Sequence, residues 1–298
     1  MLTRRTIMKT TIAAGAAAVF APAGLGHAAG TLTWKHFPAG QNGFFRAPVL
    51  VSGATEAVLI DGGFTLPDGK AVADAIKATG KTLTTIYISQ SDPDYYFSLG
   101  PIKAAFPDAK VLAATATVEA IKGSVEKKLA VWGPQLKENG PQTLADVIIP
   151  EVFAGSRLTV DGETIEIVDA EGLPNRRYLF VPSLNAVFGG VLIFNGVHVW
   201  TADTNSPELR AAWVANLEKI AARKPAIVVA GHMAPDVPTD LSGVEHTIAY
   251  LKGFDEELAK TKDSAVLKAA MEARFPGLGM GVALDIGSKV ATGEMKWG

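Results

Sequence analysis

The strongest constraint on the fold is a run of apolar and β-branched residues at positions 82–89. Only two threonines separate Leu83 from Ile86, so the run has almost no polar face. Such a run is typical of a strand that is buried on both faces, and residues 225–230 form a second run of this kind. The chain must therefore place at least two strands in the interior of a layered structure.

The rest of the chain shows two blocks of short β-type runs, each accompanied by amphipathic helical segments. We expect further strands at residues 31–37, 48–51, 57–61, 110–113, 147–153, 157–160, 164–168, 178–181 and 186–188. We expect helices at residues 68–79, 92–106, 115–136 and 206–222, and from residue 240 onward. This order predicts an α/β (α+β) fold in which two sheets pack face to face with helices outside. No change in composition marks a second domain, so we expect one domain at residues 30–238 and a C-terminal helical extension, residues 239–298, packed on it.

The first 29 residues have the composition of an export signal. A basic start is followed by an Ala-rich apolar stretch and then by small residues around Ala28. Residues 3–9 resemble a twin-arginine signal, which predicts cleavage near Ala28 and a location in the bacterial periplasm. The alternative, an uncleaved membrane anchor, is disfavoured because the stretch is short and contains Pro22. We therefore expect no stable membrane insertion after the signal is removed.

Composition excludes several classes of function. The 298 residues contain no cysteine, which excludes disulfides, thiolate metal sites, iron–sulfur clusters and a cysteine nucleophile. The formal charge of −2 provides no basic field for nucleic acid, so we expect a small-molecule substrate or ligand as the partner. No Gly-x-Ser-x-Gly motif is present, which argues against a serine hydrolase of the common α/β type.

Three segments, in order along the chain, carry a family resemblance. Residues 58–63 read Val-Leu-Ile-Asp-Gly-Gly, residues 86–95 read Ile-Tyr-Ile-Ser-Gln-Ser-Asp-Pro-Asp-Tyr, and residues 227–232 read Ile-Val-Val-Ala-Gly-His. Together with a hairpin-like segment at residues 178–194, they resemble the metallo-β-lactamase superfamily. The resemblance implies an αββα sandwich with extra C-terminal helices and an activity related to hydrolysis.

The metal ligands that the resemblance implies are mostly replaced. Aligning the H-x-H-x-D-H loop of the family on Asp94 places other residue types at the remaining ligand positions, namely Gln90, Asp92, Tyr95, Asn175 and Val191. Only Asp94 and His232 match the family in kind. After signal cleavage the chain keeps four histidines, at positions 36, 198, 232 and 246, whereas the usual dinuclear zinc site takes five histidines and two aspartates. The chain therefore cannot build that dinuclear site.

An altered metal site is one hypothesis for what remains. Asp94, His232, Asp92 and Gln90 could hold a single divalent ion such as Zn²⁺ or Mn²⁺, and carboxylate and amide oxygens favour the harder cations. A metal-bound water would then be the nucleophile, with Asp94 or Asp92 as the catalytic base. The alternatives are structural roles. Asp92 before Pro93 is typical of a helix N-cap, and a buried His232 could simply be hydrogen-bonded.

Other residues are candidates for contacts around the site. We expect Asp61 to organise a loop near the site by accepting backbone hydrogen bonds. The candidate substrate-binding residues are Tyr95, Asn175, His198, Trp200 and Asp203. Arg176 and Arg177 could pair with an anionic substrate or form a solvated surface pair. We expect the helix at residues 115–136, with Trp132, and the Trp200 loop to roof the pocket.

Two functions follow from these observations. The first is an exported hydrolase that acts on a small ester or lactone through a reduced or altered metal site. The second is a metal-free protein that binds a small molecule or a partner in the same cleft. The presence of a bound metal ion distinguishes the two.

Overall fold

The computed structural model describes residues 32–297, so the expected export signal at residues 1–29 lies outside the described residues. The first sheet has six strands in the order β1-β2-β3-β4-β5-β6. These are β1 (Thr33–His36), β2 (Val49–Ser52), β3 (Glu56–Ile60), β4 (Thr82–Ile88), β5 (Lys110–Ala113) and β6 (Glu151–Val152). β1 to β3 pair antiparallel, whereas β3 to β6 are parallel, which places the ends of β3 and β4 at the same edge.

The second sheet has five strands in the order β12-β10-β9-β8-β7. These are β7 (Arg157–Val160), β8 (Glu163–Asp169), β9 (Arg177–Val181), β10 (Ala186–Phe188) and β12 (Ile227–Val229). Two short strands, β11 (Phe194–Asn195) and β13 (His232–Met233), form a separate parallel pair. This pair was not expected from the sequence, because two residues are too few to show an alternating pattern.

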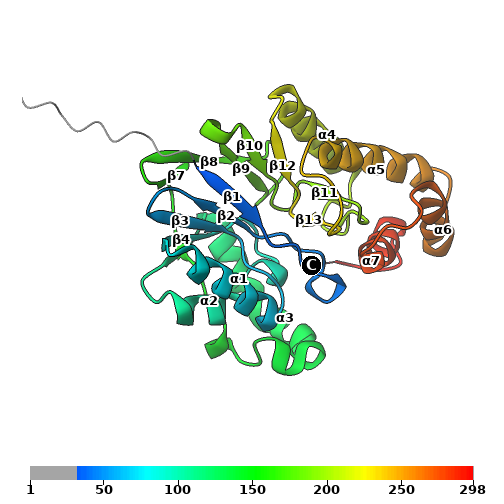
Figure 1. Cartoon of the computed structure of the whole chain (residues 1–298). Helices are drawn as coiled ribbons and strands as arrows, with labels where there is room; N and C mark the ends of the chain where they lie inside the picture. Colours follow the sequence, from blue (N-terminus) through cyan, green and yellow to red (C-terminus); the bar gives the residue numbers. More distant parts are fainter. Residues whose placement is uncertain (1–31, 298) are drawn as a thin grey trace, which may run out of the picture.

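Helices cover the outer faces of the two sheets. On the side of the first sheet lie α1 (Leu66–Thr79), α2 (Leu99–Ala105) and α3 (Thr115–Leu136) (Figure 1). On the side of the second sheet lie α4 (Pro207–Ala222) and α5 (Ser242–Leu258), while α6 (Ser264–Arg274) and α7 (Gly281–Thr292) follow at one end. Single 3₁₀ turns occur at η1 (Gln41–Gly43), η2 (Pro93–Tyr95), η3 (Lys137–Asn139), η4 (Leu144–Asp146) and η5 (Pro182–Leu184). The expected αββα sandwich with additional C-terminal helices is confirmed.

Two expected elements differ in the structure. The helix expected at residues 92–106 is interrupted, because the Tyr95 carbonyl accepts the Gly62 N–H (2.7 Å) instead of continuing the helix. Only the turn η2 and the short α2 form there. The strand expected at residues 147–153 is reduced to β6, since Pro150 has no N–H to donate to a neighbouring strand.

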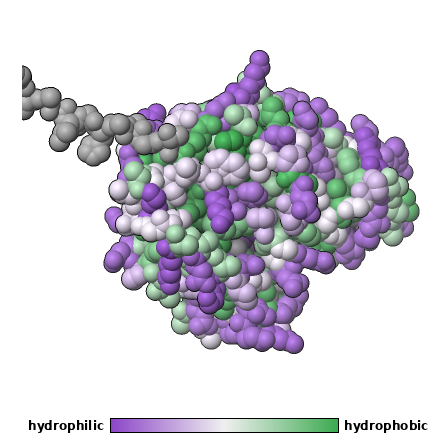
Figure 2. All heavy atoms as spheres, viewed as in Figure 1, coloured by the Kyte–Doolittle hydropathy of each residue, from purple (hydrophilic) through white to green (hydrophobic). Residues whose placement is uncertain are grey.

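Apolar side chains fill the space between the layers. Among residues 32–297, no helix has both the length and the apolar character needed to cross a bilayer. On the face shown in Figure 2, hydrophilic residues cover the projecting parts, and apolar residues are exposed between them. Three of the exposed large hydrophobic residues, Val131, Val282 and Trp297, line a cavity described below.

Candidate functional site

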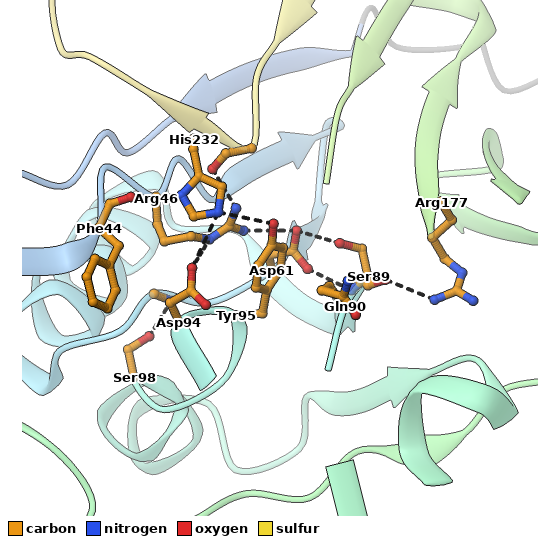
Figure 3. A network of polar contacts seen from close by, with 12 residues as sticks. Phe44, Arg46, Asp61, Ser89, Gln90, Asp94, Tyr95, Ser98, Arg177 and His232 are labelled. Carbon is orange, nitrogen blue, oxygen red and sulfur yellow. Dashed lines mark hydrogen bonds and ion pairs between the residues drawn. The ribbon is translucent and has the colours of Figure 1, made fainter. Parts of the chain in front are cut away.

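A network of buried polar side chains lies where the chain leaves the parallel strands β3 and β4 (Figure 3). Asp61 directly follows β3, and residues 89–95 follow β4, so both reach the same edge of the sheet. Arg46, just before β2, forms an isolated backbone bridge with His232 of β13. Side chains from four distant parts of the sequence therefore meet at one place.

Gly231 explains how His232 enters this network. A Cβ atom built on Gly231 would lie 1.5 Å from the Gly190 carbonyl oxygen, so only glycine fits where the two segments cross. The His232 ring stacks on Phe194, with centroids 4.9 Å apart and planes 4° apart. Its Nδ1–H donates to the Phe44 carbonyl oxygen at 2.8 Å. This bond directs Nε2 toward the centre of the network.

The side chains nearest to His232 Nε2 are Asp94 and Tyr95. The Asp94 Oδ2 atom and the Tyr95 hydroxyl oxygen each lie 3.4 Å from this nitrogen. Burial, reinforced by the positive charge of Arg46, lowers the pKa of His232 well below its usual value, so the imidazole is neutral at pH 7. Nε2 is thus an acceptor that faces a carboxyl group and a phenol.

Burial also shifts the ionisation of Asp94. It raises the pKa of this carboxyl to about 7, with a further upward contribution from the charge of Asp92 and an opposing one from Arg46. Near pH 7, both protonation states of Asp94 are therefore populated. When protonated it can donate to His232 Nε2, and when ionised it can accept a proton from a bound molecule.

Arg46 is the cation of the network, and its side chain is fully buried. Its guanidinium donates to Asp61 Oδ2 at 3.2 Å and to the Gly231 carbonyl oxygen, and Nε lies 3.8 Å from Asp94 Oδ2. One face of the guanidinium lies 3.4 Å from the centre of the Tyr95 ring. No sequence pattern indicated a role for Arg46. The available signal was a single charged residue within the apolar segment Phe-Phe-Arg-Ala-Pro-Val-Leu at positions 44–50.

Asp61 organises the loop after β4, as expected from the sequence. Its carboxylate accepts the backbone N–H of Ser89 at 2.7 Å and the Ser89 hydroxyl at 2.8 Å. Asp61 itself has a left-handed backbone conformation with a φ of 61°, which is unusual for a residue other than glycine. Burial raises the pKa of Asp61, although Arg46 and the hydrogen bonds from Ser89 oppose this shift.

A cavity of about 610 Å³ opens above Asp94 and His232. Its walls are mostly aromatic and aliphatic. The apolar part is formed by Phe44, Pro93, Ala120, Val131, Trp132, Val191, Trp200, Met280, Val282, Ile286 and Trp297, and Ser91, Asp92, Ser124, Lys127 and Lys128 add a polar portion. The expected roof of α3 with Trp132 and the Trp200 loop is confirmed. The contribution of α7 and Trp297 was not expected, because the sequence pattern of a C-terminal helix does not reveal which cavity it approaches.

The other candidate ligands at positions 90 and 92 have partners of their own. The Asp92 carboxylate lines the cavity but pairs with Lys128 at 3.2 Å, and it makes no capping hydrogen bond to η2. The Gln90 side-chain oxygen accepts hydrogen bonds from Ser91 and from Asn175. Asn175 therefore supports the loop after β4 and does not line the cavity.

The remaining substrate-binding candidates lie behind the cavity wall. His198 bonds to the Tyr250 hydroxyl at 3.0 Å, and Asp203 pairs with Arg176 at 2.6 Å. Neither residue lines the cavity, in contrast to the expectation from sequence. Arg176 and Arg177 are both buried and are neither a solvated pair nor open to a substrate. Arg177 donates to the Ser89 carbonyl oxygen at 2.9 Å and thus holds the same loop.

The donor set at this site does not fit a resident metal ion. Only Asp94 and His232 converge, and residues 32–297 contain no group of three or more His, Cys, Asp or Glu side chains that could hold a metal. Zinc sites in proteins use at least three protein ligands. The guanidinium of Arg46, 3.8 Å from Asp94, adds a positive charge that opposes a second cation. The side chains that converge here therefore provide two of the three protein ligands that a zinc site uses.

Comparisons with known proteins agree with this architecture. A family model described as the metallo-beta-lactamase superfamily matches residues 42–232. A solved structure of a metallo-beta-lactamase family protein from Thermus thermophilus is similar, with a TM-score of 0.55, 14% identity, and coverage of 85% of this chain and 91% of that chain. The structure of BLEG-1 B3 metallo-beta-lactamase has a TM-score of 0.52 and 19% identity, and the match covers 73% of this chain and 99% of that chain. At these identities the likeness shows the fold alone. No curated protein was found to match the sequence.

Proposed function

Because this chain belongs to the metallo-beta-lactamase superfamily but residues 32–297 contain no group of side chains that could hold a metal ion, we propose that it binds a small, mostly apolar molecule without a metal ion. One observation carries this proposal. Asp94 and His232 face a cavity of about 610 Å³ whose walls are otherwise largely aromatic and aliphatic. Cavities of this size and character, with a few converging polar groups, are typical of small-molecule sites. The fold of this superfamily supports a hydrolase-like activity in general terms.

The chemistry of the cavity defines the kind of ligand. Trp132, Trp200 and Trp297 provide flat apolar surface, so the body of the ligand is apolar or aromatic. At the polar end, His232 Nε2 is an acceptor, and Asp94 donates or accepts according to its protonation. The ligand is thus a molecule with an apolar body and one polar group, such as a carbonyl or hydroxyl group.

Hydrolysis of a small ester or lactone is the second candidate function. It is favoured by the raised pKa of Asp94, because a carboxyl group with a pKa of about 7 is suited to general acid–base catalysis at neutral pH. Asp94 would take a proton from a water molecule as that water attacks the carbonyl carbon, and it would give this proton to the alcohol oxygen as the ester carbon–oxygen bond breaks. We rank binding ahead of hydrolysis because binding requires only the cavity. Hydrolysis also requires a water molecule that is bound in line with the carbonyl group of the substrate.

The location of the protein is part of the proposal. Residues 1–29 have the features of a twin-arginine signal, so we propose that the mature chain acts in the periplasm. Detecting the mature chain in a periplasmic fraction, with its new N-terminus near Ala28, tests this location.

Binding can be tested with the mature protein purified in metal-free buffer. The probe is anilinonaphthalene sulfonate, whose fluorescence rises in apolar cavities, and small esters and lactones serve as competitors. We expect saturable binding that Trp200→Ala weakens and that Trp34→Ala, a control outside the cavity, leaves unchanged. Equal binding by both variants would contradict the proposal. Mass spectrometry of an organic extract would identify a ligand that copurifies.

Catalysis can be tested with the same preparation. The measurement is the hydrolysis of a nitrophenyl ester with a chelator present. If Asp94 is the base, Asp94→Asn lowers kcat on the order of 100-fold or more. A turnover that is equal in wild type and Asp94→Asn would remove the hydrolase candidate and leave the binding function intact.

A further inference from the structure

The Arg46 side chain has an unusual position for a cation. It is fully buried, and its Nε atom has no hydrogen-bond partner. Its guanidinium lies between two buried carboxylates, 3.2 Å from Asp61 and 3.8 Å from Asp94 (Figure 3). Two buried negative groups near each other are unfavourable without a neighbouring positive charge. Arg46 supplies this charge from within the chain.

The spacing of Asp94 and His232 is that of two ligands of one metal ion. Two donors that each lie about 2.1 Å from a tetrahedral ion are separated by about 3.4 Å. The Asp94 Oδ2 and His232 Nε2 atoms are 3.4 Å apart. The carboxylate of Asp61 lies on the other side of the guanidinium. Asp61 and Asp94 thus contact the guanidinium and His232 lies beside Asp94, but as arranged among residues 32–297 these three side chains do not form a group that could hold a metal ion.

We propose that Arg46 is a built-in cation that takes the place of a metal ion between Asp61, Asp94 and His232. The guanidinium balances the carboxylates and repels a divalent ion, and the Tyr95 ring, 3.4 Å away, covers one of its faces. Lys128 does not serve this role, because its ammonium pairs with Asp92 and the Ser91 carbonyl oxygen at the cavity wall. Removal of Arg46 therefore vacates the space beside Asp94 and His232, and the Asp61 carboxylate, freed from its guanidinium partner, supplies the third ligand that a divalent metal requires.

The test compares metal binding by wild type, Arg46→Ala and Arg46→Lys, each prepared without an affinity tag. Zn²⁺ and Mn²⁺ are titrated calorimetrically, and bound metal per chain is measured after dialysis. We expect Arg46→Ala to bind about one equivalent on the order of 100-fold more tightly than wild type, because a nearby positive charge has been removed. Arg46→Lys keeps that charge and should bind no better than wild type. Adding Asp94→Ala to Arg46→Ala should abolish the gained site, whereas adding His36→Ala, a histidine on the edge strand β1, should not.

A second measurement covers the case in which Arg46→Ala does not fold alone. The variant is then refolded with and without Zn²⁺ and followed by circular dichroism. The proposal expects Zn²⁺ to restore the folded spectrum, with Mg²⁺ less effective because imidazole is a poor ligand for it. The proposal is overturned if folded Arg46→Ala gains no metal, if Zn²⁺ does not restore an unfolded variant, or if wild type already holds a tight equivalent. The last result would also contradict the metal-free proposed function, whereas failure of probe binding alone would leave this inference standing.

Discussion

Replacing Arg46 by methionine isolates the energetic role of the buried cation. At 3.2 Å and an effective dielectric constant of about 20, Coulomb's law gives the Arg46–Asp61 attraction about 5 kcal/mol. The substitution also removes the desolvation penalty of the guanidinium, but it leaves Asp61 buried without its partner. Such losses typically destabilise proteins by about 3 to 5 kcal/mol. We expect Arg46→Met to lower the free energy of unfolding at pH 7 by this amount.

The assay is urea unfolding followed by tryptophan fluorescence, with EDTA present so that no metal compensates for the lost charge. The matched control is Arg274→Met. Arg274 pairs with Glu256 at 2.6 Å, but both side chains are exposed, so this substitution should destabilise the protein far less than Arg46→Met. The double variant Arg46→Met/Asp61→Asn should recover about 1 to 3 kcal/mol, because neither charge is then left alone. If Arg46→Met costs no more than Arg274→Met, the network is not held together by its internal cation.

Three further outcomes follow from the structure. The pKa of Asp94 is raised to about 7 in the folded protein, so the folded state binds an extra proton between about pH 4 and pH 7. The free energy of unfolding, measured in urea, should therefore decline as the pH rises through this window. Asp94→Asn should reduce this decline. Gly231→Ala should prevent folding or lower the melting temperature severely, because its Cβ would overlap the Gly190 carbonyl. The control is Gly123→Ala in α3, where a Cβ meets nothing within 4 Å. This substitution should instead stabilise the folded protein by about 0.5 to 1 kcal/mol. Dialysis of wild type against EDTA should leave its melting temperature and probe binding unchanged, and a fall in either would show that a metal contributes.

Local sequence patterns were sufficient to predict most of the fold. The strand at residues 110–113 and the helix at residues 115–136 have the expected bounds, because their apolar residues are spaced as a strand and a helix require. These predictions depend only on residues that are neighbours in sequence.

The polar network could be predicted only in part. Asp61, Asp94, Tyr95 and His232 were identified through motif positions, and the structure brings them together around Arg46. Arg46 belongs to no motif, and its role depends on contacts with residues up to 186 positions away, which no local pattern reports. For the same reason, the sequence did not show that His198 faces Tyr250 instead of the cavity.

The cavity draws its polar end and one of its apolar walls from different parts of the chain. Asp94 and His232 lie within the sandwich, whereas Met280, Val282 and Ile286 belong to α7 and the turn before it. Mutations in α7 can therefore alter the size and shape of the accepted molecule without disturbing the hydrogen bonds beneath it. Over generations, related chains could diverge in ligand preference through this helix while inheriting the same polar centre. A library randomised at these three positions would be a compact starting point for redesigning selectivity.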